Sequence, residues 1–207
     1  SDGNVRALSL QSNDADIAYH LPPESLEPIE KNEQLRVESI SSLRAHFILY
    51  NSNKPILQDI NVRKAIDSII NRQVIADEVM SGHATPANGP FNPSLPFGSE
   101  KEFTAFNADE AISYLEKEGF ALNANGKMEK NGEALSLKIA TYQGRPELPL
   151  MAQYLQAEAA QIGIDIEDLT IESIDAYLYD HQDEWDMVTY SNLTAPRGDG
   201  GYFFNVA

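Results

Sequence analysis

The 207-residue sequence contains no cysteine, so disulfides, thiolate metal sites and cysteine nucleophiles are all excluded. Basic side chains are also scarce: 15 lysines and arginines stand against 32 acidic residues, which gives a formal net charge of −17. A surface this negative repels phosphate backbones and anionic lipids, so we expect no nucleic-acid partner. The excess of acidic residues otherwise indicates little more than good solubility.

Long apolar runs are absent as well, and no segment approaches the roughly 20 apolar residues that a membrane helix needs. The first residues, SDGNVRALSL, lack the basic end and apolar core of a signal peptide. The sequence is therefore that of a mature protein, a cytoplasmic protein or an excised fragment. Its length allows one large domain or two small ones, with a sizeable core.

Catalytic signatures are missing too. The sequence has neither a Gly-x-Ser-x-Gly nucleophile elbow nor a Gly-x-x-x-x-Gly-Lys phosphate loop. His181 lies among Asp180, Asp183, Glu184 and Asp186, and these side chains could bind a divalent ion or serve a small α/β hydrolase. Such a run is more often a solvated acidic turn, so we predict no metal site, no cofactor and no enzymatic activity.

Helices and strands alternate along the chain, which predicts an α/β fold. Strands are expected over residues 16–21, 45–51, 127–130, 135–142, 164–171 and 185–191, and helices over residues 5–10, 62–82, 107–119, 148–161 and 174–179. Asn131-Gly132 favours a type I′ hairpin turn. The strand–helix–strand order from residue 135 to residue 171 predicts a right-handed crossover between parallel strands.

The stretch HATPANGPFNPSLPFGS, residues 83–99, contains four prolines. Because proline lacks an amide donor, neither a helix nor a central strand can pass through it. Its phenylalanines and leucine predict an ordered, extended segment lying on the surface of the domain. A non-catalytic interaction domain that uses this segment to dock a partner is an alternative hypothesis.

The final strand opens into a glycine-rich loop that carries Arg197 and Asp199. Ligands of open α/β sheets usually bind at loops that follow the carboxyl ends of strands. Gly198, Gly200 and Gly201 allow close approach of the backbone, and the fork of donors on Arg197 suits a carboxylate. This loop is the leading candidate for a ligand contact, although Arg197 could equally serve a salt-bridged structural turn.

Taken together, these segments resemble the second lobe of the peptide/nickel/opine family of extracytoplasmic solute-binding proteins (family 5), which feed ABC importers. The segments FNADEAISYLEKEGF, MEKNGEALSLKI and MAQYLQAEAAQIGIDIE are similar to the family's later helix, hairpin and crossover. The earlier signature of an Asn after a strand, an Asp-x-x-Val-Arg-x-Ala helix, a Gly and a Pro-Phe pair is matched by Asn51, Asp59, Val62, Arg63, Ala65, Gly82, Pro96 and Phe97.

The resemblance implies an α/β fold of a particular kind: the second lobe of a type II periplasmic-binding-protein-like fold, with a mixed sheet and flanking helices. Residues 1–45 would be the end of the first lobe and the approach to the hinge. Residues 46–207 would be the second ligand-binding lobe, in a protein truncated at both ends. Ligand would be trapped between two lobes by hinge closure.

The same resemblance bears on the ligand. Peptide-binding members carry an aspartate in the last loop for the peptide amine, and Pro196 occupies that position here. The order Ala195-Pro196-Arg197 follows the nickel-chelate branch, with Leu193 replacing a tryptophan and Arg197 a tyrosine. Arginine would repel a bare cation and favour a chelate with a carboxylate. The residues expected to contact ligand are Tyr190, Asn192, Leu193, Thr194, Arg197 and Tyr202.

The expected function is therefore the substrate-binding component of an ABC transporter that imports nickel as an organic chelate, or short peptides. An oligopeptide or dipeptide receptor is the alternative within the family. The expected partners are a small-molecule ligand and the permease subunits, and the protein is expected to be a monomer. It would work outside the cytoplasm, in the periplasm or lipid-anchored to the outer face of the cell membrane.

Overall fold

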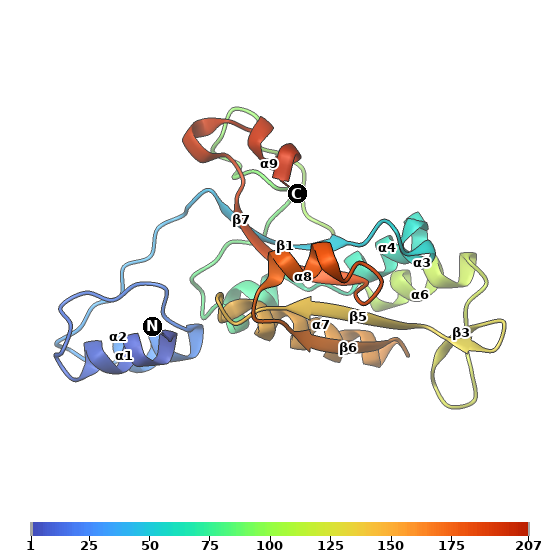
Figure 1. Cartoon of the computed structure of the whole chain (residues 1–207), viewed down its shortest axis with the longest axis horizontal. Helices are drawn as coiled ribbons and strands as arrows, with labels where there is room; N and C mark the ends of the chain where they lie inside the picture. The colour runs from blue at the N-terminus through green and yellow to red at the C-terminus, as the bar shows by residue number, and fades with distance from the viewer. Residues whose placement is uncertain (1, 207) are drawn as a thin grey trace.

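The computed structural model describes residues 2–206 and, within them, a mixed four-stranded sheet (Figure 1). Its strands are β1 (Arg44–Tyr50), β5 (Ser136–Thr141), β6 (Asp165–Thr170) and β7 (Met187–Leu193), in the order β1-β7-β5-β6. Strand β5 is parallel to both β6 and β7, whereas β1 is antiparallel to β7. The predicted parallel crossover through residues 135–171 is confirmed.

Helices flank both faces of this sheet because alternate strand residues point to opposite sides. Ile139 and Met187 belong to the larger core, which α4 (Ile60–Ser68), α6 (Ala108–Lys117) and α7 (Glu147–Gln161) complete. Their neighbours Ala140 and Val188 point the other way and pack with Ile174 at the start of α8 (Ile174–Asp180). The expected α/β architecture, a mixed sheet with flanking helices, is confirmed.

A small second sheet contains β2 (Ala121–Leu122), β3 (Met128–Lys130) and β4 (Glu133–Ala134). The turn between β3 and β4 is Asn131-Gly132, with φ angles of 55° and 82°. Positive φ at both positions is what a type I′ turn requires, so the predicted hairpin is confirmed. The Asn107 side chain accepts a hydrogen bond from the Glu110 amide and caps α6, the helix expected over residues 107–119.

The helix expected over residues 62–82 is wrong as a single element. Helix α3 (Pro55–Gln58) precedes α4, which ends at Ser68, and the chain restarts in α5 (Arg72–Val74) and a π-helical turn, η2 (Ile75–Val79). The cause is local: the Asn71 side chain accepts a hydrogen bond from the Val74 amide and so starts a new helix instead of continuing the old one.

The N-terminal segment, residues 2–43, forms a separate small cluster at one end of the molecule (Figure 1). It contains α1 (Gly3–Gln11), η1 (Pro23–Ser25) and α2 (Leu26–Glu30). The strand predicted over residues 16–21 is wrong. No described strand pairs with this stretch, Ile17 is 87% exposed, and His20 has a positive φ of 53°.

Residues 83–99 contain no helix or strand and run beside the last turns of the chain, η3 (Pro196–Gly198) and α9 (Gly201–Val206) (Figure 1). Phe91 lies edge-on to Phe97, with ring centroids 5.0 Å apart, and contacts Phe203 of α9. The prediction that neither a helix nor a strand passes through this segment is confirmed, but residues 92–98 form two turns, closed by the amides of Leu95 and Gly98, instead of an extended chain. The segment buttresses the loop that follows β7. Among residues 2–206, no helix combines the length and the apolar character needed to cross a bilayer.

Asn51 joins the end of β1 to the start of β7. Its side-chain amide donates to the carbonyls of Gln182 (2.7 Å) and Trp185 (2.9 Å), and its backbone amide donates to the carbonyl of Asp186 (2.8 Å). The residue is only 3% exposed. Buried polar groups are costly to leave unpaired, so this one side chain holds the register of the two strands.

We expect the substitution Asn51→Ala to lower the free energy of unfolding by about 2 kcal/mol or more, because two carbonyls lose their donor. Denaturant unfolding followed by circular dichroism measures the change. Asn53→Ala is the matched control: its amide makes an exposed hydrogen bond to Gln182, so the loss should stay within about 0.5 kcal/mol. Equal losses in the two variants would contradict this role of Asn51.

His46 lies on the α7 side of β1, with Nε2 3.7 Å from Oε1 of Glu147. Its Nδ1 is buried and has no hydrogen-bond partner among the described residues. Burial lowers the pKa of the imidazole below its usual value near 6.5; Glu147 opposes this shift, and Arg145 and Arg44 add to it. The folded protein therefore holds this imidazole in its neutral form.

A histidine with a lowered pKa takes up its proton more readily in the unfolded chain than in the folded one. The stability that neutral His46 contributes is therefore fully present above pH 6.5 and falls as the pH drops below it. We expect His46→Gln to reduce the loss of thermal stability between pH 7 and pH 5, measured by scanning calorimetry. Identical pH profiles for the two proteins would show that His46 has no such effect.

Candidate functional site

The candidate site lies at the edge of the sheet where β5 and β7 end. Because β1 runs antiparallel to β7, the first residue of β1 reaches the same edge, and the register pairs Arg44 with Leu193. This end of the sheet also carries the loop that the sequence marks as a ligand contact. Carboxyl ends of strands in open α/β sheets are the usual place for ligands.

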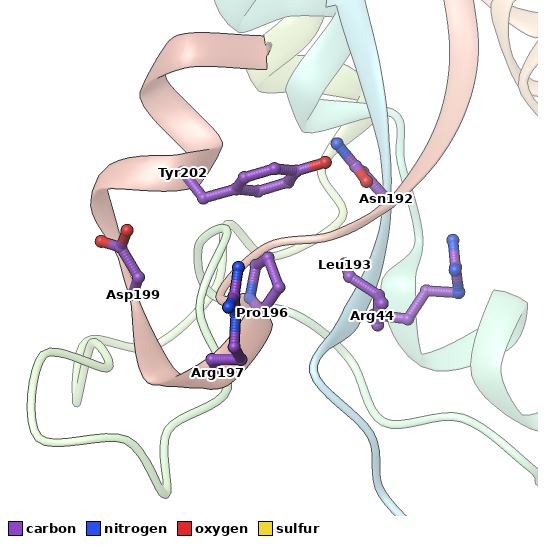
Figure 2. Close-up of a pocket in the computed structure, with 7 residues that line it drawn as sticks. All are labelled: Arg44, Asn192, Leu193, Pro196, Arg197, Asp199 and Tyr202. Carbon is purple, nitrogen blue, oxygen red and sulfur yellow. The ribbon is translucent and has the colours of Figure 1, made fainter.

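A cavity of about 330 Å³ opens at this edge (Figure 2), and we refer to it as the β7 cavity. It lies between the end of β7, the η3 turn and α9, with β1 on the far side. The ring of Tyr202 extends from α9 toward Asn192 of β7 (Figure 2). The residues that line the cavity are Arg44, Asn192, Leu193, Pro196, Arg197, Asp199 and Tyr202.

The loop around this cavity is held by a few specific contacts. Thr194 is buried, and both its amide and its hydroxyl donate to the carbonyl of Leu43, at 2.9 and 3.1 Å. A side chain added at Gly200 would come within 3.0 Å of the Phe97 ring, so glycine permits the close contact with the proline-rich segment. Asp199 accepts a hydrogen bond from the Gly201 amide at 2.9 Å where α9 begins.

Four of the six predicted contact residues line the β7 cavity: Asn192, Leu193, Arg197 and Tyr202. Thr194 instead lies beneath the loop, and Tyr190, on the same face of β7 as Asn192, is not among the lining residues. The Tyr190 hydroxyl donates to Oδ1 of Asp175 at 2.7 Å. Burial raises the pKa of Tyr190, and the hydrogen bond to Asp175 raises it further.

Three further residues line the cavity that were not among the six expected contacts: Arg44, Pro196 and Asp199. Pro196 and Asp199 belong to the loop that the sequence predicts as a ligand contact, so the sequence identifies their segment but not their individual roles. Arg44 is 147 residues away from Ser191, the residue whose hydroxyl its Nη1 contacts at 3.1 Å. No local pattern marks Arg44, and only the pairing of β1 with β7 brings it to the cavity.

The electrostatics of the β7 cavity are unusual for a chain with a net charge of −17. Arg44 is half-buried, and this burial lowers the pKa of its guanidinium, with Arg145 adding to the shift. Arg197 is exposed, and neither Arg44 nor Arg197 forms an ion pair with a carboxylate of residues 2–206. Guanidinium groups without counter-ions suit a ligand that brings a carboxylate.

A metal ion bound by protein side chains alone has less support at this site than a ligand that carries a carboxylate. No group of three or more His, Cys, Asp or Glu side chains among residues 2–206 is arranged to hold a metal ion. In the acidic turn noted above, His181 Nδ1 lies 3.0 Å from Oε1 of Glu184, and its ring stacks on Tyr177. The wall of the β7 cavity provides a single carboxylate, Asp199, and no imidazole.

Comparison with known proteins places this geometry in context. The nickel-binding protein NikA of Staphylococcus aureus is 39% identical over the whole chain. The glutathione-binding protein GsiB of Escherichia coli is 27% identical over 164 residues, 79% of the chain and 30% of its own length. The chain spans only 40% of the length of the Staphylococcus protein.

The similar solved structures include nickel-binding and nickel-transport proteins, as the sequence comparison does. The crystal structure of Staphylococcus aureus NikA in complex with Ni(L-His)2 superimposes with a TM-score of 0.84 at 38% identity, covering 99% of this chain and 42% of that one. A nickel ABC transporter protein from Bacillus halodurans gives a TM-score of 0.81 at 43% identity, covering 100% and 43%.

Oligopeptide-binding AppA of Bacillus subtilis shares the fold, with a TM-score of 0.78 at 22% identity over 93% of this chain and 39% of its own. The family model described as the middle region of the bacterial extracellular solute-binding proteins, family 5, matches residues 1–206. Together with the fold and the site, this match shows that the chain belongs to family 5 of the bacterial extracellular solute-binding proteins.

Proposed function

We propose that the chain is part of the substrate-binding component of an ABC importer and that it takes up nickel as an organic chelate bearing a carboxylate. The observation that carries this proposal is the pair of arginines at the β7 cavity, Arg44 and Arg197, neither of which has a carboxylate partner among residues 2–206. Two relatives, at 39% and 43% identity, are named for nickel binding or nickel transport.

The chemistry of the cavity supports a chelate over bare nickel. Guanidinium groups repel a free cation but attract the carboxylate of an organic chelator. A bare nickel ion would also need several nitrogen or oxygen ligands from the protein, and the cavity wall offers one carboxylate. A metal held here would therefore bring most of its donor atoms with it.

A peptide ligand is the second candidate. GsiB, a relative at 27% identity, is named for binding glutathione, which is itself a short peptide. Against this candidate, Pro196 stands where the amine-binding aspartate of peptide receptors would be, and Asp199 already accepts a hydrogen bond from Gly201. The nickel chelate is therefore the better fit.

We further propose that residues 46–207 act as one ligand-binding lobe and that residues 1–45 approach a hinge. Two features support this division. The N-terminal segment has a small hydrophobic core of its own, built around Leu10 and Ile29, and the chain enters β1 directly beside the β7 cavity. A protein of this kind would act outside the cytoplasm with a membrane permease, either in the periplasm or anchored to the membrane by lipid.

Calorimetry on the complete natural protein tests the ligand. We expect heat of binding with nickel plus L-histidine and little or none with nickel chloride alone, because the arginines recognise the chelator. Binding only to short peptides would overturn the nickel proposal. Tight binding of nickel without a chelator would overturn the argument from charge.

The substitution Arg197→Gln tests the role of the loop. Losing a charge-assisted hydrogen bond to a carboxylate should weaken the binding of nickel–histidine by about 10-fold. Lys101→Gln is the control, because Lys101 is exposed and does not line the β7 cavity, and the affinity of this variant should stay within about 2-fold. A larger loss from Lys101→Gln than from Arg197→Gln would contradict this assignment of the site.

A further inference from the structure

Strand β6 is the last strand of the mixed sheet, and its outer edge has no partner strand among residues 2–206 (Figure 1). The Ile171 amide, just after β6, donates to the carbonyl of Thr141 in β5 at 2.8 Å, so the odd-numbered residues direct their backbone groups toward β5. Successive residues of a strand point these groups to opposite edges. The amides and carbonyls of Ile166, Asp168 and Thr170 therefore face away from the sheet, and such a row is a template for pairing with another chain.

Asp168 interrupts the apolar face of this strand. Ile166, two positions earlier, belongs to the larger core. Asp168 pairs with Ile139 of β5, which belongs to the same core. Because directly paired residues share a face of the sheet, the Asp168 side chain points to the α7 side. An acidic residue therefore stands where the alternation of the strand would place an apolar one.

The carboxylate of Asp168 is also uncompensated. No ion pair or hydrogen bond of its side chain is found in residues 2–206, and its Oδ1 is buried. Burial raises the pKa of this carboxyl above its usual value. The other acidic residues of β6 have partners, since Asp165 pairs with Lys127 and Glu167 with Lys138. A buried oxygen without a partner destabilises the folded chain, so the packing of a single chain does not account for Asp168.

Gln156 of α7 covers part of the same edge. Its Nε2 donates to the carbonyl of Ile166 at 2.6 Å, and the Gln156 side chain is half-buried. This carbonyl is one of the outward-facing groups, so the side chain occupies an acceptor that a neighbouring strand would need. Edge strands are commonly protected by such coverage and by charges that point inward.

The chain segment that would fit this edge best is β6 of a second copy, paired antiparallel about a two-fold axis. In an antiparallel ladder the outward-facing residues of one strand lie opposite those of the other. The register that uses all of them centres on Asp168 and places Ile166 opposite Thr170 of the second copy. It also places Asp168 opposite its own equivalent, with Cβ atoms about 5 Å apart, where like charges destabilise the pairing.

We propose that the outer edge of β6 is a surface on which a second copy of the chain would pair, and that Asp168 and Gln156 keep this edge closed. Asp168 opposes the pairing by charge, and Gln156 opposes it by occupying the carbonyl of Ile166. A monomer in solution follows from the closed edge. The inference is independent of the ligand, because neither Asp168 nor Gln156 lines the β7 cavity.

Sedimentation velocity on the complete natural protein, over a range of concentrations, tests the edge. We expect the unchanged protein to be a monomer. Asp168→Asn removes the charge with little change of shape and should raise the association constant of the dimer by about 5-fold or more. Gln156→Ala frees the carbonyl of Ile166 and should raise it as well. The double variant should associate more strongly than either single variant.

Glu167→Gln is the matched control, because it removes the same charge one residue away. Its side chain lies on the other face, beside Lys138, and would face Leu169 of the second copy. The association constant of this variant should stay within about 2-fold of that of the unchanged protein. Circular dichroism checks folding, and Asp168→Asn should unfold at the same temperature or a higher one, since it removes an uncompensated charge.

A further substitution shows whether backbone pairing causes the association. Thr170→Pro, added to Asp168→Asn, removes an outward-facing amide and should abolish the dimer, because proline cannot donate to a ladder. If this variant does not fold, Thr170→Lys replaces it, since a lysine on an edge strand also blocks pairing.

The remaining outcomes would overturn the proposal. A dimeric unchanged protein would show that the edge is not closed or that another surface associates. Equal association of Glu167→Gln and Asp168→Asn would show a general effect of net charge. A double variant that stays monomeric at every concentration would show that Asp168 and Gln156 do not guard the edge.

Discussion

The antiparallel pairing of β1 with β7 is the constraint on which the rest of the site depends. It joins residues about 140 positions apart in the chain, and Asn51 fixes where the pairing begins by binding the carbonyls of Gln182 and Trp185. A shift of one residue would turn every side chain of β1 to the other face. Arg44 would then no longer lie beside Ser191.

The same pairing places basic and aromatic side chains of β1 on opposite faces of the sheet. Arg44 and His46 point toward α7 and its glutamate, Glu147, whereas Phe47 faces the aromatic ring of Tyr190 on the α8 side. The basic side chains of Arg44 and His46 thus lie on one face at the carboxyl edge. The aromatic groups on the other face support the loop from behind, together with Phe203 of α9. A rigid scaffold beneath an irregular loop is a common arrangement for binding sites.

Much of the fold could be predicted because its signals are local. The Asn131-Gly132 turn, the Asn107 cap and the proline-rich segment each follow from what a few neighbouring residues can or cannot do. Two predicted elements were wrong because a local pattern does not show where an element breaks or whether a strand finds a partner. The periodicity of residues 62–82 concealed the break at Asn71, and the apolar pattern of residues 16–21 predicted a strand that has no partner among the described residues.

For the candidate site, the sequence by itself determined the loop after β7 and, through its motifs, the family. Four predicted residues of that loop and its flanks line the cavity because they are neighbours in the chain. Only the tertiary structure decided which distant residues join them. Arg145 meets His20 across 125 positions, and Arg44 meets Ser191 across 147. Backbone pairing carries no local signature of its partner, so long-range register, and not composition, brings these charges together.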